Sequence, residues 1–460
     1  MRSVRTSSGG AIAAAVALLL MAGCNDKKDD AKSSSSAPVA PSSASSSSSA
    51  PSSAAPDKSS STAPSAEPSS TAPAEPVQEN VKLSVFSTRP DAGDDAKKAF
   101  AERVKAFEAK NPNIKLDPRE FAWDAATFPA LLAGKQVPTV FQVPFTDGRI
   151  LIARKQVSDI TAAVKTLPYG DKWNKSILAA AQDESGNIFA MPTEAYANGF
   201  HYNRELFKAA GLDPEKPPTT WDEVRTYAKT IKDKTGKPGY VMMSSNNTGG
   251  WQLTTAVYSL GGRMETIDAS GKATATINTP ETKKILEYLK AMRFEDDSMG
   301  ATFTYDWPTS NEAFGAGKFG MYTQGANVYN NLVSSFKVDP KTYGLAPLPV
   351  DTSNPDAGTL TGGTLTVVVA GASDAEKQAA VNWINYQYLG LFTNKEAAIA
   401  KAKLDNEAKQ PVGTPQTPIF DQATLDESIS WTKEFNNVPL DQMKPFVDAL
   451  PTLKLIPEPP

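Results

Sequence analysis

The sequence predicts an α/β fold that is divided into two domains. Residues 81–460 form a stretch longer than the roughly 250–300 residues that a single hydrophobic core usually serves. Along this stretch, short runs of β-branched and aromatic residues alternate with amphipathic helical patterns. Strands that alternate with helices build βαβ units, so each domain is expected to hold a mostly parallel sheet flanked by helices.

The first residues have the three parts of an export signal. Arg2 and Arg5 precede an apolar run over residues 11–21, and the small residues Ala22 and Gly23 follow it. The apolar run is shorter than the ~20 residues that a membrane-spanning helix needs. We therefore predict that residues 1–23 are a signal peptide and that the exported chain does not span the membrane.

Cys24 is the only cysteine of the chain, so it has no disulfide partner within it. Met21–Cys24 resembles a lipobox, the cleavage site that leaves an acylated cysteine at the new N-terminus. We predict lipidation of Cys24, with palmitate-type chains, which would hold the protein on the bilayer at the extracytoplasmic face of the cell membrane. The alternative is a chance cysteine at the end of an ordinary signal peptide.

Residues 24–80 are predicted to be the lipidated cysteine and a tether. Ser, Ala and Pro dominate this segment, and large apolar side chains are almost absent from it. Such a segment buries too little area to offset its chain entropy, so we expect disorder. Its composition does not decide whether the Ser and Thr residues carry sugars.

The first part of the folded region predicts alternating strands and helices. Strands are expected at Leu83–Phe86, Ile114–Leu116 and Thr139–Val143. Asp94–Lys110 has apolar residues at helical spacing, and Ala125–Leu132 predicts a second, shorter helix. A further extended stretch is expected to run into Pro192.

Helix start and stop signals mark the second part. Gly211 ends a predicted helix over Arg204–Ala210. Capping-box patterns at Thr220–Glu223 and Ser373–Glu376 each predict a helix start, and the first of these helices should stop at Gly236. Thr279–Pro280 begins another helix. We also expect a hairpin turn at 268–271.

Five segments form a series whose order and spacing cover nearly all of Val81–Leu450, although each motif alone is weak. They are Ala190–Met191–Pro192, Tyr202–Leu212, Pro218–Glu223, Ala313–Met321 and Thr361–Thr364. This series resembles the family 1 extracellular solute-binding proteins, the maltose-binding-like group.

The resemblance implies a two-lobed periplasmic-binding-protein-like fold of type II, with a hinge between lobes that close around a ligand. Because the chain of such proteins crosses the hinge several times, each lobe is discontinuous. We expect one lobe at 81–195 plus 305–350 and the other at 196–304 plus 351–460.

The resemblance also implies a function. A monomeric lipoprotein without a cofactor would capture a sugar or oligosaccharide and deliver it to the permease subunits of an ABC importer. Two alternatives share the anchor and tether: a surface polysaccharide-binding adhesin, and a glycoside hydrolase, which needs only two suitably spaced carboxylates. The identity of the solute and the host type, Gram-positive or Gram-negative, stay open.

Candidate ligand residues follow from how sugars are held, by aromatic faces and by planar polar groups. Trp251, after the loop-like stretch 244–250, is the first candidate, and Trp307 and Trp123 are others; core packing is the alternative for each. Thr88 and Arg89 follow the first strand. Asp147 follows the third, where the carboxyl ends of parallel strands form a crevice.

Glu194, Tyr196 and Asn198 lie where the chain is expected to pass from one lobe to the other. Gln324 and Asn327 follow Met321, in a segment that resembles the ligand loop of the family. Solvated loops or caps are the alternative for these five residues, and Gly363 is a further candidate. Gly363, with its neighbour Gly362, is expected to permit a backbone turn or a close approach.

The composition disfavours other functions. The net charge of −4 comes without a basic cluster, so we expect no nucleic-acid partner. His201 is the only histidine and no G-x-S-x-G motif is present, which disfavours a Ser–His–Asp hydrolase. With one Cys and one His, a zinc site would rest mostly on carboxylates. We predict no catalytic residue and no metal site.

Overall fold

The computed structural model of the chain describes residues 80–90, 92–268 and 272–459. The predicted signal peptide, Cys24 and nearly all of the tether lie outside the described residues, as does most of the predicted turn at 268–271. In the described part, no helix has both the length and the apolar character needed to cross a membrane.

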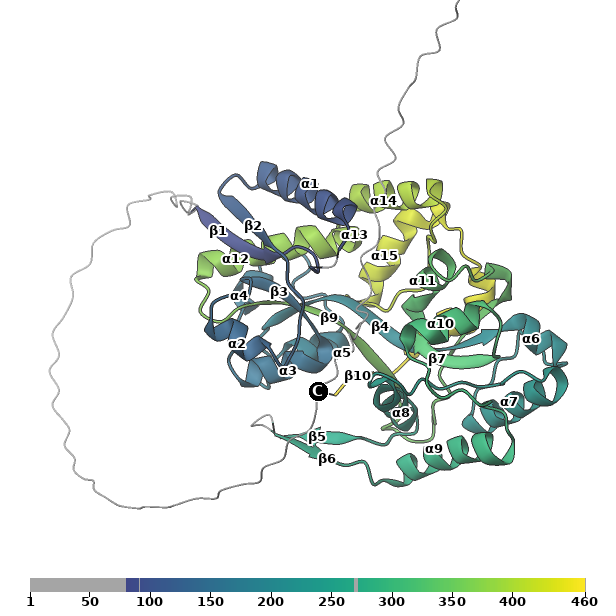
Figure 1. The fold of residues 1–460 in the computed structure, drawn as a ribbon. Helices are drawn as coiled ribbons and strands as arrows, with labels where there is room; N and C mark the ends of the chain where they lie inside the picture. Colours follow the sequence, from purple (N-terminus) through teal and green to yellow (C-terminus); the bar gives the residue numbers. More distant parts are fainter. Residues whose placement is uncertain (1–79, 91, 269–271, 460) are drawn as a thin grey trace, which may run out of the picture. The chain divides into compact units, whose positions relative to one another are not determined.

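The strands lie in one large sheet and one small hairpin (Figure 1). Their bounds are β1 (Val81–Phe86), β2 (Ile114–Arg119), β3 (Val140–Pro144), β4 (Ala190–Asn203), β5 (Glu265–Ile267), β6 (Ala273–Ala275), β7 (Met321–Gly325), β8 (Tyr343–Pro347), β9 (Thr359–Val368) and β10 (Leu455–Pro457).

Helices flank the large sheet (Figure 1). The α-helices are α1 (Asp94–Lys110), α2 (Phe128–Ala133), α3 (Phe145–Ala153), α4 (Thr161–Val164), α5 (Lys175–Leu178), α6 (Arg204–Ala209), α7 (Trp221–Thr235), α8 (Thr248–Ser259), α9 (Pro280–Lys290), α10 (Trp307–Gly315), α11 (Tyr329–Ser334), α12 (Asp374–Ile384), α13 (Gly390–Thr393), α14 (Lys395–Glu407), α15 (Gln422–Thr432) and α16 (Lys444–Ala449).

The large sheet runs in the order β2-β1-β3-β9-β4-β7, with β10 beside β9 and β8 beside β4. The first strands, β2, β1 and β3, pair in parallel, as the βαβ pattern predicts. The long strands β9 and β4 then pair antiparallel to each other and to β3, β7 and β8. β4 and β9 therefore connect two parts of the sheet, which we call the β1 half and the β7 half.

The predicted helix signals act as expected. In α1, Phe100, Val104 and Phe107 are all buried on one face. The side chains of Ser373 and Glu376 form a reciprocal capping box at the start of α12. At α7 only half of the predicted box forms, because Glu223 accepts from the amide of the residue before the cap, Thr219, at 2.7 Å. Gly236 ends α7 with φ at 72°.

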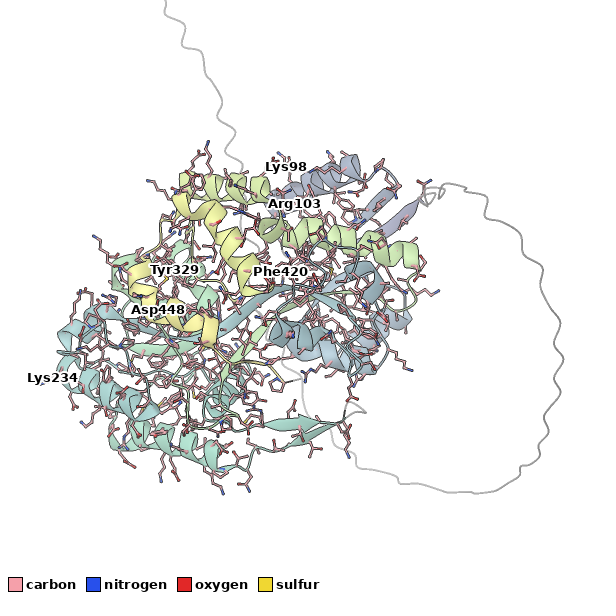
Figure 2. All side chains as sticks on the ribbon, turned by 180° about the vertical axis from the view of Figure 1, so that it is seen from behind. Lys98, Arg103, Lys234, Tyr329, Phe420 and Asp448 are labelled. Carbon is pink, nitrogen blue, oxygen red and sulfur yellow. The ribbon has the colours of Figure 1, made fainter. Side chains whose placement is uncertain are left out.

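The hydrophobic core on the β1 half draws on distant parts of the chain. Trp383 of α12 is fully buried, with ring centroids 5.7 Å from Phe100 and 5.1 Å from Phe107. Phe420, labelled in Figure 2, packs on Trp173 with centroids 4.7 Å apart. Residues beyond 364 therefore complete the core that begins with β1.

The core on the β7 half corrects the expected lobe boundaries. Residues 305–350 are expected with 81–195, but β7 and β8 pair with Asn198–Asn203 of β4 instead. Tyr329, labelled in Figure 2, packs on Tyr343 in the same core as α10 and Met443. Likewise, residues 351–460 do not stay together, since α12 packs on β1 while α16 packs on β8. The reason is that β4 and β9 each extend through both halves.

Candidate functional site

The middle of β4 carries predicted site residues on one face. Successive strand side chains point to opposite faces, so Glu194, Tyr196 and Asn198 share a face. Glu194 and Tyr196 lie in the part of β4 that pairs with β9, whereas Asn198 pairs with Gly325 of β7. These residues therefore mark the point at which the chain passes from the β1 half to the β7 half.

Two glycines of β9 pair with this part of β4. Gly363 pairs with Ala195, and a Cβ on it would collide with the carbonyl oxygen of Glu194. A Cβ on Gly362 would collide with the hydroxyl of Tyr196 and the carboxylate of Glu458. Other atoms thus come close to the backbone at both positions; a side chain is excluded most strictly at Gly363, where the near atom belongs to the backbone.

Glu194 is held by neutral donors. Asn327 Nδ2 donates to Glu194 Oε1 at 3.1 Å, and Thr364 Oγ1 donates to Oε2 at 3.4 Å. Asn327 belongs to a short 3₁₀ turn after β7, so this contact joins the two halves of the sheet. Burial raises the pKa of the Glu194 carboxyl, and the two hydrogen bonds offset the rise only in part.

Glu458 is not among the predicted site residues, but its carboxylate accepts hydrogen bonds from two that are, Tyr196 and Trp251. Tyr196 Oη donates to Glu458 Oε1 at 2.6 Å, and Trp251 Nε1 donates to the same oxygen at 2.8 Å. The backbone amide of Glu458 donates to the carbonyl of Thr361 at 2.8 Å, just after β10. Burial also raises the pKa of this carboxyl, against the effect of the two hydrogen bonds.

We call the set Glu194, Tyr196, Trp251, Asn327 and Glu458 the crossing cluster. Little in the sequence signals the role of Glu458. Leu455–Pro457 is a short apolar run near the end of the chain, but nothing in it indicates that it pairs with residues 359–361.

Trp251 is a helix residue, not a loop residue as predicted. Asn247 adopts φ at 65° and acts as the N-cap, so the helix begins at Thr248 and includes Gly249 and Gly250. The indole is half-buried against the core of the β7 half. The Asn and Gly residues that indicate a loop in the sequence instead turn the chain into α8 and form its first turn.

Asn198 and Gln324 are buried in the β7 half. Asn198 Nδ2 donates to the carbonyl of Leu360 at 3.3 Å and to Thr255 Oγ1 at 3.5 Å. Its Oδ1 is fully buried, and no donor among the described residues reaches it. Gln324 Nε2 contacts the sulfur of Met243 at 3.4 Å.

Trp123 and Asp147 meet at the carboxyl ends of the β1-half strands. Trp123 Nε1 donates to Asp147 Oδ2 at 3.0 Å, and the indole packs on Phe128 and Phe141. Burial raises the pKa of Asp147. Together the two residues form a second polar and aromatic pair at the crevice expected for ligands.

The remaining predicted residues lie outside both groups. Thr88 is buried and lines a pocket of about 180 Å³ with Lys97 and Glu120, and the half-buried Arg89 follows it. Trp307 begins α10 and packs edge-on against Phe336, with centroids 6.4 Å apart.

A larger pocket lies apart from all the predicted site residues. Its volume is about 740 Å³, and its lining comes from the segment between Thr161 and Ile188. Throughout the described ranges, no group of three or more His, Cys, Asp and Glu side chains is arranged to hold a metal ion.

Comparison with known families identifies the chain. The profile of the family described as bacterial extracellular solute-binding protein matches residues 92–389. The chain is 28% identical over 270 residues to the sn-glycerol-3-phosphate-binding periplasmic protein UgpB of Brucella abortus, covering 56% of this chain and 59% of the relative. The same-named protein of Escherichia coli K12 is 24% identical over 269 residues, covering 55% and 58%. The match thus spans less than two thirds of these relatives.

Solved structures share the fold. UgpB of Mycobacterium tuberculosis, in complex with glycerophosphocholine, has a TM-score of 0.61 at 18% identity, covering 82% of this chain and 87% of that one. The cyclic α-maltosyl-1,6-maltose binding protein of Arthrobacter globiformis has a TM-score of 0.58 at 20% identity, covering 82% and 88%. The predicted two-lobed periplasmic-binding-protein type of fold is confirmed. Because the family profile covers more than half of the residues, this chain belongs to the bacterial extracellular solute-binding proteins.

Proposed function

We propose that this protein is an extracytoplasmic lipoprotein, anchored through Cys24, that captures a sugar or polyol-containing solute and delivers it to an ABC importer. The crossing cluster is the observation that carries the proposal. It gathers two aromatic rings, two carboxylates and one amide from β4, α8, the turn after β7 and the residue after β10, at the passage between the two halves of the sheet.

The proposed lobes follow the corrected packing. One lobe consists of β1, β2 and β3 with α1 and α12, and the other consists of β7 and β8 with α7 and α8. β4 and β9 connect them as the hinge. A solute that contacts both lobes would favour the closed state to the extent that it binds that state better. In the proposed ligand site, Trp123 and Asp147 would line the side formed by the first lobe, and the crossing cluster would form the floor.

The similar proteins support a carbohydrate or glycerol-based solute. The curated relatives are named for sn-glycerol 3-phosphate, and the structural neighbours hold glycerophosphocholine or are named for a cyclic maltosaccharide. All of these solutes present several hydroxyl or ester oxygens, which suit the donors and acceptors of the crossing cluster.

A thermal-shift screen followed by calorimetry tests the proposal. The purified protein is tested against mono- and oligosaccharides, sn-glycerol 3-phosphate and glycerophosphocholine, with amino acids as controls. A solute at 100 times its Kd should raise the stability by about 2.7 kcal/mol. One solute class should bind without release of smaller products.

Other outcomes point elsewhere. Breakdown of an oligosaccharide during the assay would indicate a glycoside hydrolase. Binding of long polysaccharide alone, with no response to any small solute, would indicate an adhesin. If no compound of the panel binds, the proposal that the protein captures a sugar or polyol-containing solute is contradicted.

A further inference from the structure

Within the part of the chain that the structure describes, the two carboxylates of the crossing cluster have no cationic partner. The hydrogen bonds that Glu194 and Glu458 accept from the described residues come from neutral side chains, which are Asn327, Thr364, Tyr196 and Trp251. Among the described residues, no Lys or Arg forms an ion pair with either of them. The two acidic groups are therefore compensated by neutral hydrogen-bond donors and not by a positive charge of the described residues.

Burying a carboxylate in this way is costly. The free energy of removing an ionised carboxylate from water is several kcal/mol unless charge or hydrogen bonds compensate it. Glu458 is only 9% exposed, and the hydrogen bonds that its carboxylate accepts from the described residues all reach one oxygen, Oε1. An arrangement that destabilises the unliganded protein is a common feature of functional sites.

In the described part of the chain, a buried acceptor without a donor lies further along β4. Asn198 is fully buried on the same face of β4 as Glu194, and its Oδ1 has no partner in the described part of the chain. Its amide nitrogen donates to Leu360 and Thr255. Leu360 precedes Thr361, whose carbonyl accepts from the Glu458 amide. The Thr255 hydroxyl donates to the carbonyl of Trp251, whose indole donates to Glu458. This observation is independent of the carboxylates, because the face of β4 that carries Glu194 also holds an acceptor for which the described residues supply no donor.

Two aromatic rings border the same region. Trp251 and Tyr196 both donate to Glu458, so both rings lie beside its carboxylate. The faces of Trp and Tyr attract cations through the quadrupole of the ring, and an adjacent carboxylate adds to this attraction. Phosphate or carboxylate groups of a solute would be repelled at this position.

We propose that the solute carries a positively charged ammonium group, and that Glu458 and Glu194 bind this group beside Trp251 and Tyr196. The inference rests on the proposed solute-binding function and names its substrate class as amino sugars or choline-bearing polyols. Glu458 is then a specificity residue supplied by the end of the chain. The hydroxyls of a neutral sugar can also donate to carboxylates, but only a cation offsets the charge of the two acidic groups.

Calorimetry with paired probes tests the proposal on the full exported chain. D-glucosamine is compared with D-glucose, and glycerophosphocholine with sn-glycerol 3-phosphate. At least one ammonium probe should bind about tenfold or more tightly than its partner, as expected for a desolvated cation beside aromatic rings and carboxylates. Glu458→Gln, which keeps the shape of the side chain, should remove most of that preference.

Two further variants control for folding and charge. Glu458→Asp keeps the carboxylate and should keep part of the preference, and the exposed Glu205→Gln should leave both affinities unchanged. Melting curves establish that each variant is folded. Tighter binding of the neutral or anionic probe, or an unchanged preference in Glu458→Gln, overturns the cation inference but leaves solute capture standing. If no probe or sugar binds, both proposals fail.

Discussion

At the scale of single residues, Trp251 distinguishes a binding role from a packing role. Replacing it with Ala removes a ring and the indole donor to Glu458, so the binding free energy of the solute should weaken by about 1–3 kcal/mol, a loss of affinity of roughly five- to 150-fold. Calorimetry with the best solute of the screen measures this loss.

Trp307→Ala is the matched control. Trp307 packs on Phe336 and contacts no residue of the crossing cluster in the described structure, so this variant should lower the melting temperature and leave the affinity unchanged. If Trp251→Ala instead lowers stability alone, the crossing cluster is a packing feature and not the ligand site.

His201 should make the protein less stable in acid. The ring is fully buried between Tyr343, which it contacts at 2.8 Å, and the carbonyl of Gln324 at 3.1 Å, and burial lowers its pKa to about 4. Between about pH 6.5 and 4, His201 is therefore protonated in the unfolded chain but stays neutral in the folded protein. Stability should fall by about 3 kcal/mol across this window as the pH decreases.

Chemical denaturation at several pH values measures the contribution of His201. In His201→Gln, this part of the acid sensitivity should disappear, whatever the variant does to stability at neutral pH. An equal slope in both proteins between pH 6.5 and 4 would mean that other groups dominate.

Glu458 should have the opposite effect on the pH dependence of stability. Its pKa is raised in the folded state by burial, and Glu194 and Tyr196 are the titratable groups of β4 beside it. As the pH rises above about 4.5, the unfolded chain ionises first, so stability should decrease through the raised pKa. Glu458→Gln should therefore gain stability relative to the parent protein as the pH rises. A difference that is constant with pH would contradict the buried state of this carboxyl.

The residues of the candidate site were partly predictable. Glu194, Tyr196 and Asn327 could be proposed because the motifs that carry the family resemblance lie next to them. Trp251 could be proposed by its type and a helix could be predicted just after it, at Leu253–Leu260, but the earlier start of that helix could not, because Asn247 in a left-handed conformation begins it. Glu458 could not be proposed, because its role depends on pairing between residues about a hundred positions apart in the chain.

At the scale of elements, the contact between β9 and the crossing cluster depends on Gly362. An Ala here would meet the Tyr196 hydroxyl and the Glu458 carboxylate, so Gly362→Ala should lower the free energy of unfolding by about 1–3 kcal/mol and weaken solute binding. Denaturant titration and calorimetry measure the two effects.

Gly93→Ala provides the comparison. A Cβ at Gly93 meets no atom within 4 Å, and the residue has φ at −66°, so its replacement should change stability by well under 1 kcal/mol. If Gly362→Ala is equally harmless, β9 can move away from the cluster and the close approach is not required.

Local signals explain which elements could be predicted. α1 has the bounds that its apolar spacing predicts, and α12 begins at its capping box. The predicted helix at Ala125–Leu132 is shorter and begins at Phe128, because Thr127 is its N-cap and Pro129 lies in its first turn. The partners of β9 and β10 are set by tertiary pairing, which leaves no local signal.

At the scale of the whole molecule, the last residues should matter for both stability and binding. Deleting residues 454–460 removes β10, its parallel partnership with Thr359–Thr361, and Glu458. We expect a lower melting temperature and a loss of affinity at least as large as that of Glu458→Gln. A deletion of residues 459–460 alone is the control. Unchanged affinity after the longer deletion would exclude the C-terminal strand from the site.

The bounds of the two lobes could not be predicted from the sequence. The family resemblance correctly indicates two discontinuous lobes as a type of fold, but the assignment of 305–350 to the first lobe fails because β7 and β8 extend β4. Which half a segment joins depends on the strands it pairs with, and the apolar pattern of such a segment is the same in either half.

The late position of β9 has a consequence for biosynthesis. β3 is complete at residue 144, yet its antiparallel neighbour begins at residue 359, about 200 residues further along the chain. At translation speeds of about 5–20 residues per second, a ribosome needs on the order of 10–40 seconds to produce that intervening length. Throughout this interval the nascent polypeptide lacks its central sheet, so it can still be threaded through a narrow channel as an unfolded chain.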